Sequence, residues 1–233
     1  MKLAIIQPYF MPYIGYFQLL NAVDKVVIYD NIEYTKKGWF NRNRISLNGN
    51  IHTFTIPIKK DSDYLNVDQR FLAENAEKEI VKTLAQIRQN YSETPFFNDI
   101  YPVIESCFLC KEKNLSGFIF NSIVQLTSLL QITTELIASS TVLVDHSLRK
   151  EEKVMGICRQ LKADVYYNSI GGTSLYNKNE FAENGITIKF LKTRDIHYQQ
   201  TENNFFPNLS IIDVLMFNGV DKTRQFLNAY ELM

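Results

Sequence analysis

The sequence predicts an α/β fold with a mainly parallel, Rossmann-like sheet, a β-hairpin excursion and a helical insertion. Three observations predict it. Short apolar strands alternate with helical patterns at both ends of the 233-residue chain, an Asn48-Gly49 pair separates two alternating segments, and residues 73–131 are largely helical in pattern. We expect one α/β domain over residues 1–233, with the helical insertion at about residues 73–131.

The first thirty residues predict a strand, a helix and a second strand. Residues 3–6 are a short, continuous apolar run, which is typical of a buried strand. Apolar side chains then recur at three-residue spacing (Ile14, Phe17 and Leu20), which predicts a helix. Residues 25–29 are β-branched and aromatic, as strands prefer. The length of the crossover favours a parallel pair of strands.

A hairpin should follow this unit. Residues 44–58 alternate between apolar and polar side chains on both sides of Asn48-Gly49. This dipeptide suits a tight type I′ turn, which needs positive φ at both positions. Pro57 predicts that the second hairpin strand ends there or lies at a sheet edge.

Strands and helices alternate again after the helical segment. The sequence predicts strands at TTELIAS, DVYYNS and ITIKFL, and the intervening helices at SLRKEEKVMGICRQLKA and NKNEFAENG. Gly185 should cap the second of these helices. A helical tail is expected after Pro207.

The composition excludes several classes of protein. The chain has 25 Lys and Arg residues against 25 Asp and Glu residues, so its charge favours neither a general nucleic-acid surface nor an acidic membrane. No apolar run approaches the roughly 18 residues of a membrane-spanning helix, and the opening run is too short and aromatic for a signal peptide. Three cysteines, an odd number, suit a reducing compartment, so we expect a cytoplasmic protein. The oligomeric state stays open.

The loop after the first strand, QPYFMPYIGYF, is rich in aromatic residues and proline. In open parallel sheets ligands bind outside the carboxyl ends of the strands, and the start of the next helix suits an anion. A tyrosine offers an apolar face and a hydroxyl group, which suits a sugar or a base. We therefore expect Phe10 and Phe17 to pack inward, and the ligand crevice to be lined by Gln7, Tyr9, Tyr13 and Tyr16. The alternative is that the rings only seal the sheet against its helices.

A basic and aromatic cluster occupies residues 29–44. Asp30 ends the second strand, at the expected ligand edge, and is a candidate catalytic base. Asn41 and Asn43 are candidate donors for an oxyanion. Arginine and lysine suit phosphate, so the candidate substrate contacts here are Tyr34, Lys36, Trp39, Arg42 and Arg44. A solvated, charged turn is the alternative.

A Gly-Gly pair stands in NSIGGTSLY, between a predicted strand and a helix. Glycines allow close backbone approach, and their amides can bind an anion. The segment has neither the Walker lysine nor the GxGxxG spacing. The candidate contacts are Ser169, Gly171, Gly172 and Tyr176, and the alternative is a turn that merely needs positive φ.

The last candidates precede the final helix. His197 is a second candidate base, and Asn208 and Ser210 are either substrate contacts or the N-cap of that helix. No metal-binding motif is present and we expect no metal. The alternative of a zinc site would need Cys107 and Cys110 with the remote ligands Cys158 and His146, and buried thiols explain these cysteines adequately.

Together these segments resemble the WbqC-like family of bacterial proteins. The similar pieces are QPYFMPYIGYFQLLNAVDKVVIYDNIEYTKKGWFNRNRI, SIGGTSLY and FFPNLSIIDVLMFNG, in this order over essentially the whole chain. Thr173 stands where the family usually carries arginine after the paired glycines. His197-Tyr198 stands where it tends to carry His-Pro, so any role of that arginine or proline does not transfer.

The resemblance implies a role in O-antigen or other surface-polysaccharide biosynthesis. The implied activity is transfer of an aminoacyl group, such as glycyl, to the amino group of a nucleotide-linked deoxy-amino sugar. ATP or an aminoacyl-tRNA would supply the activated amino acid. Two alternatives remain, a nucleotidyltransferase of the HUP type and a non-catalytic, sugar-nucleotide-binding partner of a polysaccharide assembly complex.

Overall fold

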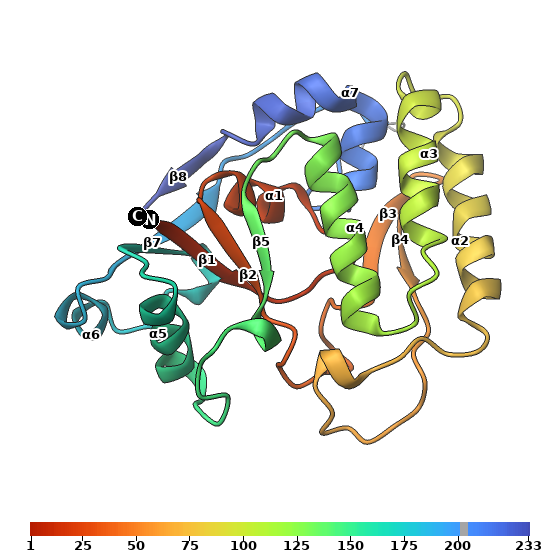
Figure 1. Cartoon of the computed structure of the whole chain (residues 1–233). Coiled ribbons are helices and arrows are strands. Elements are labelled where there is room, and N and C mark those ends of the chain that lie inside the picture. The colour runs from red at the N-terminus through yellow and green to blue at the C-terminus, as the bar shows by residue number, and fades with distance from the viewer. Residues whose placement is uncertain (201–204) are drawn as a thin grey trace.

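The computed structural model describes residues 1–200 and 205–233 and confirms the α/β fold (Figure 1). Its main sheet has six strands in the order β5-β2-β1-β6-β7-β8. Neighbouring strands are parallel except for the β7–β8 pair. The strands are β1 (Lys2–Ile6), β2 (Lys25–Ile28), β5 (Glu135–Ala138), β6 (Val165–Ser169), β7 (Thr187–Thr193) and β8 (Tyr230–Leu232).

The strand order reverses direction beside β1. From β1 the chain continues to β2 on one side, and the strands that come later, β6 and β7, lie on the other side. The carboxyl ends of β1 and β6 therefore flank a topological switch point, the place where open α/β sheets bind ligands.

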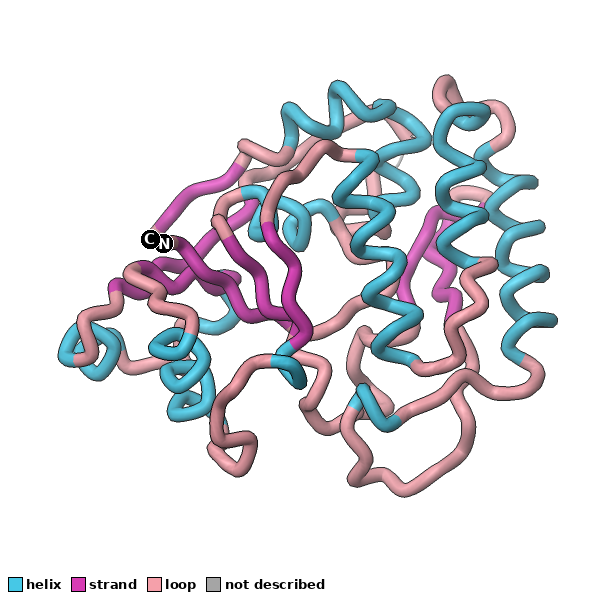
Figure 2. The backbone as a smooth tube through the Cα atoms, in the orientation of Figure 1, coloured by secondary structure: helices cyan, strands magenta, loops and turns pink. Residues whose placement is uncertain are grey.

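Helices cover both faces of the sheet (Figures 1 and 2). Successive strand residues point to opposite faces, so Ala4 joins one core and Leu3 and Ile5 join the other. The Ala4 core includes α1 (Ile14–Asn21) and α7 (Ile211–Phe226), and the opposite core includes α5 (Lys150–Gln160) and α6 (Lys178–Glu183). Short 3₁₀ turns are η1 (Val67–Gln69), η2 (Ser139–Thr141) and η3 (Ile170–Gly172).

The predicted hairpin is confirmed as a separate two-stranded sheet, β3 (Arg42–Leu47) and β4 (Asn50–Thr55). Asn48 and Gly49 both have positive φ, 49° and 70°, as a tight turn of this kind requires. The strand ends at Thr55, just before Pro57. Beside the hairpin lie three helices, α2 (Ala76–Tyr91), α3 (Phe97–Phe108) and α4 (Leu115–Leu129).

Phe10 joins the loop after β1 to this helical part. Its ring lies 4.9 Å from that of Phe108 and 4.8 Å from that of Phe118, on α3 and α4. Phe10 and Phe17 are both fully buried, as the sequence predicted. The same core that covers one face of the sheet therefore continues between the hairpin and helices α2–α4.

The C-terminal tail departs from the predicted helix. Helix α7 is interrupted at Gly219, whose φ is +65° and where a Cβ atom would lie 2.6 Å from the Phe96 ring. The chain then ends in β8, antiparallel to β7. Three residues are too few to show a strand period, so the local pattern did not reveal β8.

A buried carboxylate joins the start of α7 to two distant segments. Asp213 accepts hydrogen bonds from the hydroxyls of Tyr91 (2.8 Å) and Tyr198 (2.6 Å) and from the Gln200 amide (3.0 Å). Burial raises the pKa of Asp213, and the three hydrogen bonds oppose that rise. Because all the donors are neutral, the network positions α7 without an ion pair.

Within the described ranges, no helix has the length and apolar character needed to cross a bilayer.

Replacing Phe17 by alanine tests the packing of α1 on the sheet. The side chain is fully buried, so we expect Phe17→Ala to lower the free energy of unfolding by about 3–5 kcal/mol. Phe71, which is 49% exposed, is the matched control, and Phe71→Ala should cost about 1 kcal/mol. Urea unfolding of both variants measures the difference. Equal losses would contradict the assignment of Phe17 to the core.

Candidate ligand-binding site at the switch point of the sheet

A cavity of about 1050 Å³ opens at the carboxyl ends of β1 and β6. Its wall is formed by the loop and first turn after β1, by residues 38–40 before the hairpin, by the η3 turn after β6 and by the first turns of α5. This is the location that the switch point predicts for a ligand. We call it the switch-point pocket.

The pocket brings together candidates from three separate segments of the sequence. The candidates among its lining residues are Gln7, Tyr9, Tyr13, Tyr16, Trp39, Ser169, Gly171, Gly172 and Tyr176. Their roles in binding stay predictions, but they share one cavity although more than 160 residues separate Gln7 from Tyr176.

The aromatic loop is fixed to the hairpin by Asn43. The Asn43 side-chain oxygen accepts from the Tyr9 hydroxyl (3.1 Å) and from the Arg44 backbone (2.7 Å), and its amide group donates to the carbonyls of Phe10 and Met11. The side chain is fully buried. In this structure its amide hydrogens are therefore used on the backbone, and a catalytic role for Asn43 stays a prediction.

Tyr13 is positioned by the glycine that follows it two residues later. A Cβ atom at Gly15 would lie 2.4 Å from the Tyr13 ring and 2.6 Å from the Thr193 hydroxyl oxygen. No larger residue therefore fits without moving the ring that lines the pocket. The backbone on the other side is held by Ser210, whose hydroxyl donates to the Met11 carbonyl at 2.7 Å and caps α7.

The tyrosine hydroxyls of the pocket are protonated at neutral pH. Burial raises the pKa of Tyr13 and of Tyr16. Burial also raises the pKa of Tyr9, although the positive charge of Arg44 opposes that rise. The Tyr9 hydroxyl already donates to Asn43, and the Tyr16 hydroxyl donates to the Gln7 carbonyl at 3.1 Å. Of the three, the Tyr13 hydroxyl is the one without an acceptor among the described residues, and none of them is suited to act as a base.

The Gly-Gly turn meets the pocket through its backbone. A Cβ atom at Gly171 would have no atom within 4 Å, whereas one at Gly172 would lie 3.0 Å from the Asn168 side chain. Neither glycine has positive φ, so the alternative of a turn that only needs positive φ is wrong. Nearby, the Tyr166 hydroxyl donates to Tyr176 at 3.3 Å and accepts from the Asn168 amide at 2.9 Å.

Arg42 and Arg44 both stack on Trp39. Their guanidinium carbons lie 5.0 and 5.3 Å from the centre of its ring. Trp39 lines the pocket and is 40% exposed, while the two arginines stand outside the lining. The Nε atoms of both arginines are buried without a hydrogen-bond partner among the described residues. These two cations therefore stand against the tryptophan wall of the cavity.

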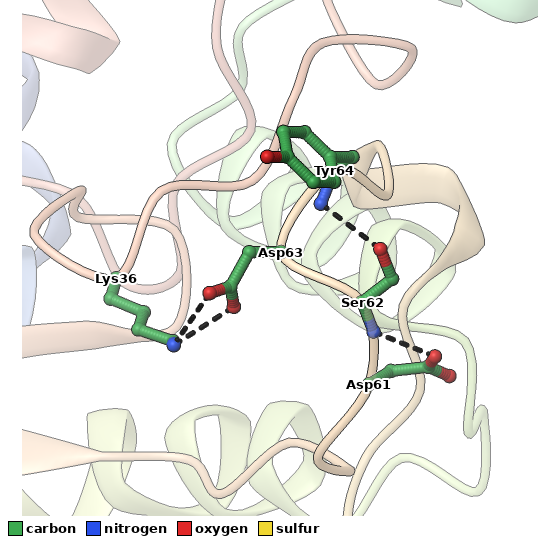
Figure 3. Close-up of polar contacts among 5 residues, drawn as sticks. All are labelled: Lys36, Asp61, Ser62, Asp63 and Tyr64. Atoms are coloured by element: carbon green, nitrogen blue, oxygen red, sulfur yellow. Dashed lines mark hydrogen bonds and ion pairs between the residues drawn. The ribbon is translucent and has the colours of Figure 1, made fainter.

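Other candidates lie outside the lining. Tyr34 is buried and donates to the Asn41 amide oxygen at 3.0 Å, and Asn41 donates to the Ile56 carbonyl at 2.7 Å. Lys36 is exposed and paired with Asp63 at 2.8 Å (Figure 3). These contacts secure the segment that leads into the hairpin.

The three candidates that precede α7 also stand apart from the cavity. The exposed His197 has its ring 4.8 Å from Phe205. Asn208 has a φ of +57°, and its carbonyl accepts from Arg44 at 3.4 Å. Ser210 is fully buried. The substrate or catalytic roles of all three stay predictions.

Asp30 is buried in a set of hydrogen bonds at the end of β2. Its carboxylate accepts from the Ser139 hydroxyl (2.8 Å), from the backbone and hydroxyl of Ser140 (2.9 and 2.6 Å), and from the Asn31 backbone (3.0 Å). These contacts join the ends of β2 and β5. The carboxylate therefore anchors this edge of the sheet, and its use as a base stays a prediction.

Sequence reasoning missed Lys150, Glu151 and Asn168, which also line the pocket. Lys150 has a φ of +47°, a conformation that residues other than glycine rarely adopt. Glu151 accepts from the Asn177 backbone at 2.8 Å. The sequence could have identified Lys150 and Glu151, because they begin a predicted helix between two predicted parallel strands. Such helices begin at the same edge of the sheet as the aromatic loop.

Metal ligands do not gather in the described part of the chain. There, no group of three or more His, Cys, Asp or Glu side chains is placed to hold a metal ion. Cys107 and Cys158 are buried in the two cores on opposite faces of the sheet, so they do not share the zinc site considered above.

Replacing Asp30 by alanine separates an anchor from a base. Removal of the carboxylate leaves the amide and hydroxyl of Ser140 and the Asn31 amide without this acceptor, so we expect a loss of at least about 2 kcal/mol in the free energy of unfolding. The exposed Asp221 is the control, and Asp221→Ala should change the free energy by about 0.5 kcal/mol or less. Chemical denaturation measures both. An unchanged stability in Asp30→Ala would contradict the anchoring role.

Comparison with known proteins places most of the chain in one family. The model of the WbqC-like protein family matches residues 7–225. A protein of Mycobacterium tuberculosis (strain ATCC 25618 / H37Rv), described as uncharacterized protein Rv1507c, is 29% identical over 226 residues, which cover 94% of this chain and 95% of the relative. No solved structure gives a significant match. The chain, with its aromatic loop and its Gly-Gly turn in one pocket, belongs to the WbqC-like protein family.

Proposed function

We propose that the switch-point pocket binds a nucleotide-linked amino sugar and that the protein transfers an aminoacyl group to the sugar's amino group, in surface-polysaccharide biosynthesis. The observation that carries the proposal is the pocket itself. It lies where doubly wound sheets bind nucleotides, and its lining includes tyrosine and tryptophan rings and a Gly-Gly turn. The aminoacyl part of the proposal rests on the resemblance described above.

The lining suits the separate parts of such a ligand. The rings of Tyr9 and Trp39, with centres 6.2 Å apart, offer faces for a base or a sugar. Arg42 and Arg44 bring positive charge against the far side of this wall, where a diphosphate can be held. Lys150 supplies a further positive charge from the start of α5.

The reaction forms an amide bond and breaks the acyl–oxygen bond of an activated amino acid. The sugar amine must be neutral to attack, so a base takes its proton, and donors stabilise the tetrahedral oxyanion. Among the carboxylates of the described residues, Glu151 lines the pocket and is our candidate for the base. The Tyr13 hydroxyl and the backbone of Gly171 and Gly172 are candidate donors. The leaving group is the phosphate of an ATP-derived adenylate or the ribose of an aminoacyl-tRNA.

A product assay tests this function directly. Purified protein is incubated with nucleotide-linked amino sugars and with amino acids supplied either with ATP or as aminoacyl-tRNA. We expect an amide product, detected by mass spectrometry, that disappears in Glu151→Gln. Pyrophosphate release from a nucleoside triphosphate and a sugar phosphate, with no amino acid present, would favour a nucleotidyltransferase instead. Tight binding with no product from any donor would favour a non-catalytic binding partner.

Replacing Tyr13 by phenylalanine tests the pocket without disturbing the fold. The ring and its packing against Gly15 remain, so the melting temperature should stay within about 2 °C of the parent, while removal of one hydrogen bond should weaken nucleotide-sugar binding by about 5- to 10-fold. Tyr64, which is 85% exposed, provides the control Tyr64→Phe. Calorimetry measures affinity. Parental binding and turnover in Tyr13→Phe would remove this hydroxyl from the site.

A further inference from the structure

Arg70 is a buried arginine whose Nε atom has no hydrogen-bond partner among the described residues. Its side chain follows the η1 turn and is only 3% exposed. The Nε atom is buried with no hydrogen-bond partner, and no ion pair among the described residues includes this guanidinium. The guanidinium lies over the Tyr34 ring, whose centre is 4.9 Å from the guanidinium carbon.

A guanidinium group in this position is costly to the free protein. It carries five N–H donors in a rigid fork, and removing them from water is unfavourable unless acceptors replace the lost hydration. The face of Tyr34 offers a cation–π contact but accepts none of the in-plane N–H groups. Arg70 is therefore placed to donate to a group that the protein does not itself supply.

The surroundings of Arg70 are positively charged. Burial raises the pKa of the Tyr34 hydroxyl, and the charges of Arg70 and Arg42, the hydrogen bond with Asn41 and the charge of Lys36 oppose that rise. The positive charge of Arg70 also reaches the Asp63 carboxylate. The pKa of Asp63 is lowered mainly by its hydrogen bond with Lys36 and to a smaller extent by Arg70. Asp63 is paired with Lys36, so the positive charges of Arg70 and Arg42 favour the binding of a further anion near Tyr34.

Asp63 is a displaceable carboxylate. It lies on the exposed loop that faces Lys36, and both of its oxygens approach the Lys36 amine, at 2.8 and 3.0 Å (Figure 3). Both side chains are largely exposed, 76% for Lys36 and 65% for Asp63, so water and salt weaken this ion pair. A phosphoryl group can therefore compete with Asp63 for Lys36.

The backbone around Arg70 is fixed. The Arg70 amide donates to the Val67 carbonyl at 3.2 Å, and the Arg70 carbonyl accepts from Leu115 at 2.8 Å, the first residue of α4. On the opposite side, the Tyr34 amide donates to the Leu65 carbonyl at 3.1 Å. These hydrogen bonds fix the backbone positions of both Arg70 and Tyr34 before a ligand binds.

We propose that Arg70, with Lys36 and the charge of Arg42, forms a second anion site that binds a phosphoryl group. In the free protein Asp63 forms an ion pair with Lys36, and the phosphoryl group displaces Asp63 when it binds. Arg70 and Lys36 are separate from the switch-point pocket, because neither lines that cavity, and Arg42, which stacks on Trp39 of its wall, is the residue that the two sites share. The second anion site goes beyond the proposed transfer reaction. Its test needs no turnover, so the two proposals can fail independently.

Titration of the full chain with inorganic phosphate and pyrophosphate at low ionic strength tests the site. Arg70→Met keeps an apolar stem on Tyr34 but loses the donors, so we expect the affinity for these anions to fall about 10- to 100-fold. Asp63→Asn removes the competing charge and should raise the affinity about 3- to 10-fold. Arg88→Met is the matched control, because Arg88 also stacks on a tyrosine, Tyr101, at 5.0 Å, and it should bind as the parent does.

The melting temperature in phosphate-free buffer separates a binding role from a structural one. Arg70→Met removes an unpaired buried charge, so we expect its melting temperature to equal or exceed that of the parent and no longer to rise with phosphate. A lower melting temperature together with parental anion affinity would show that Arg70 is structural and would overturn the proposal. If Arg70→Met does not fold, Lys36→Gln and Asp63→Asn must shift the affinity in opposite directions for the proposal to stand.

Absence of binding by the parent and by Asp63→Asn at millimolar anion would also overturn the site. A parallel titration with UDP-N-acetylglucosamine identifies the source of the phosphoryl group. A lower affinity in Arg70→Met means that one ligand reaches both sites, and an unchanged affinity means that a separate phosphorylated molecule uses Arg70. Either result upholds the anion site.

Discussion

The hydrogen bonds of Asn43 fix the loop after β1, and the form of the switch-point pocket depends on them. This buried amide accepts from Tyr9 and donates to the carbonyls of Phe10 and Met11, so one side chain from the hairpin holds both a ring and the backbone of the loop. A buried amide with these partners is costly to separate from them, because each freed polar group would lack water. The hairpin therefore acts as the support of the pocket wall.

The start of α7 supports the same loop from the other side. Ser210 donates to the Met11 carbonyl, and the Ile211 amide donates to the Pro12 carbonyl at 2.8 Å. Asp213 in turn fixes this end of α7 to Tyr91 and Tyr198. The pocket tyrosines therefore stand on a rigid base before a ligand binds, and such preorganisation lowers the entropic cost of binding.

Local signals explain what the sequence could predict. The β1–α1–β2 unit and the Asn48-Gly49 turn are encoded by neighbouring residues, and the position directly after a parallel strand predicted that the aromatic loop would lie at the ligand edge of the sheet. Contacts between distant segments explain what it could not. Asn43 reads as a polar residue in a charged segment, and only the fold shows that its partners lie 32 to 34 residues away. The neighbours of Arg70 in the sequence likewise do not indicate that it is buried against Tyr34. The pairing of β8 with β7 also depends on segments that are far apart in the sequence.

A crystal structure of the protein with a nucleotide-linked amino sugar would show whether the switch-point pocket is the binding site. We expect the ligand to lie between the carboxyl ends of β1 and β6, against the rings of Tyr9 and Tyr13 and the backbone of Gly171 and Gly172. A ligand bound elsewhere on the protein, with the switch-point pocket free of it, would show that this pocket is not the substrate site.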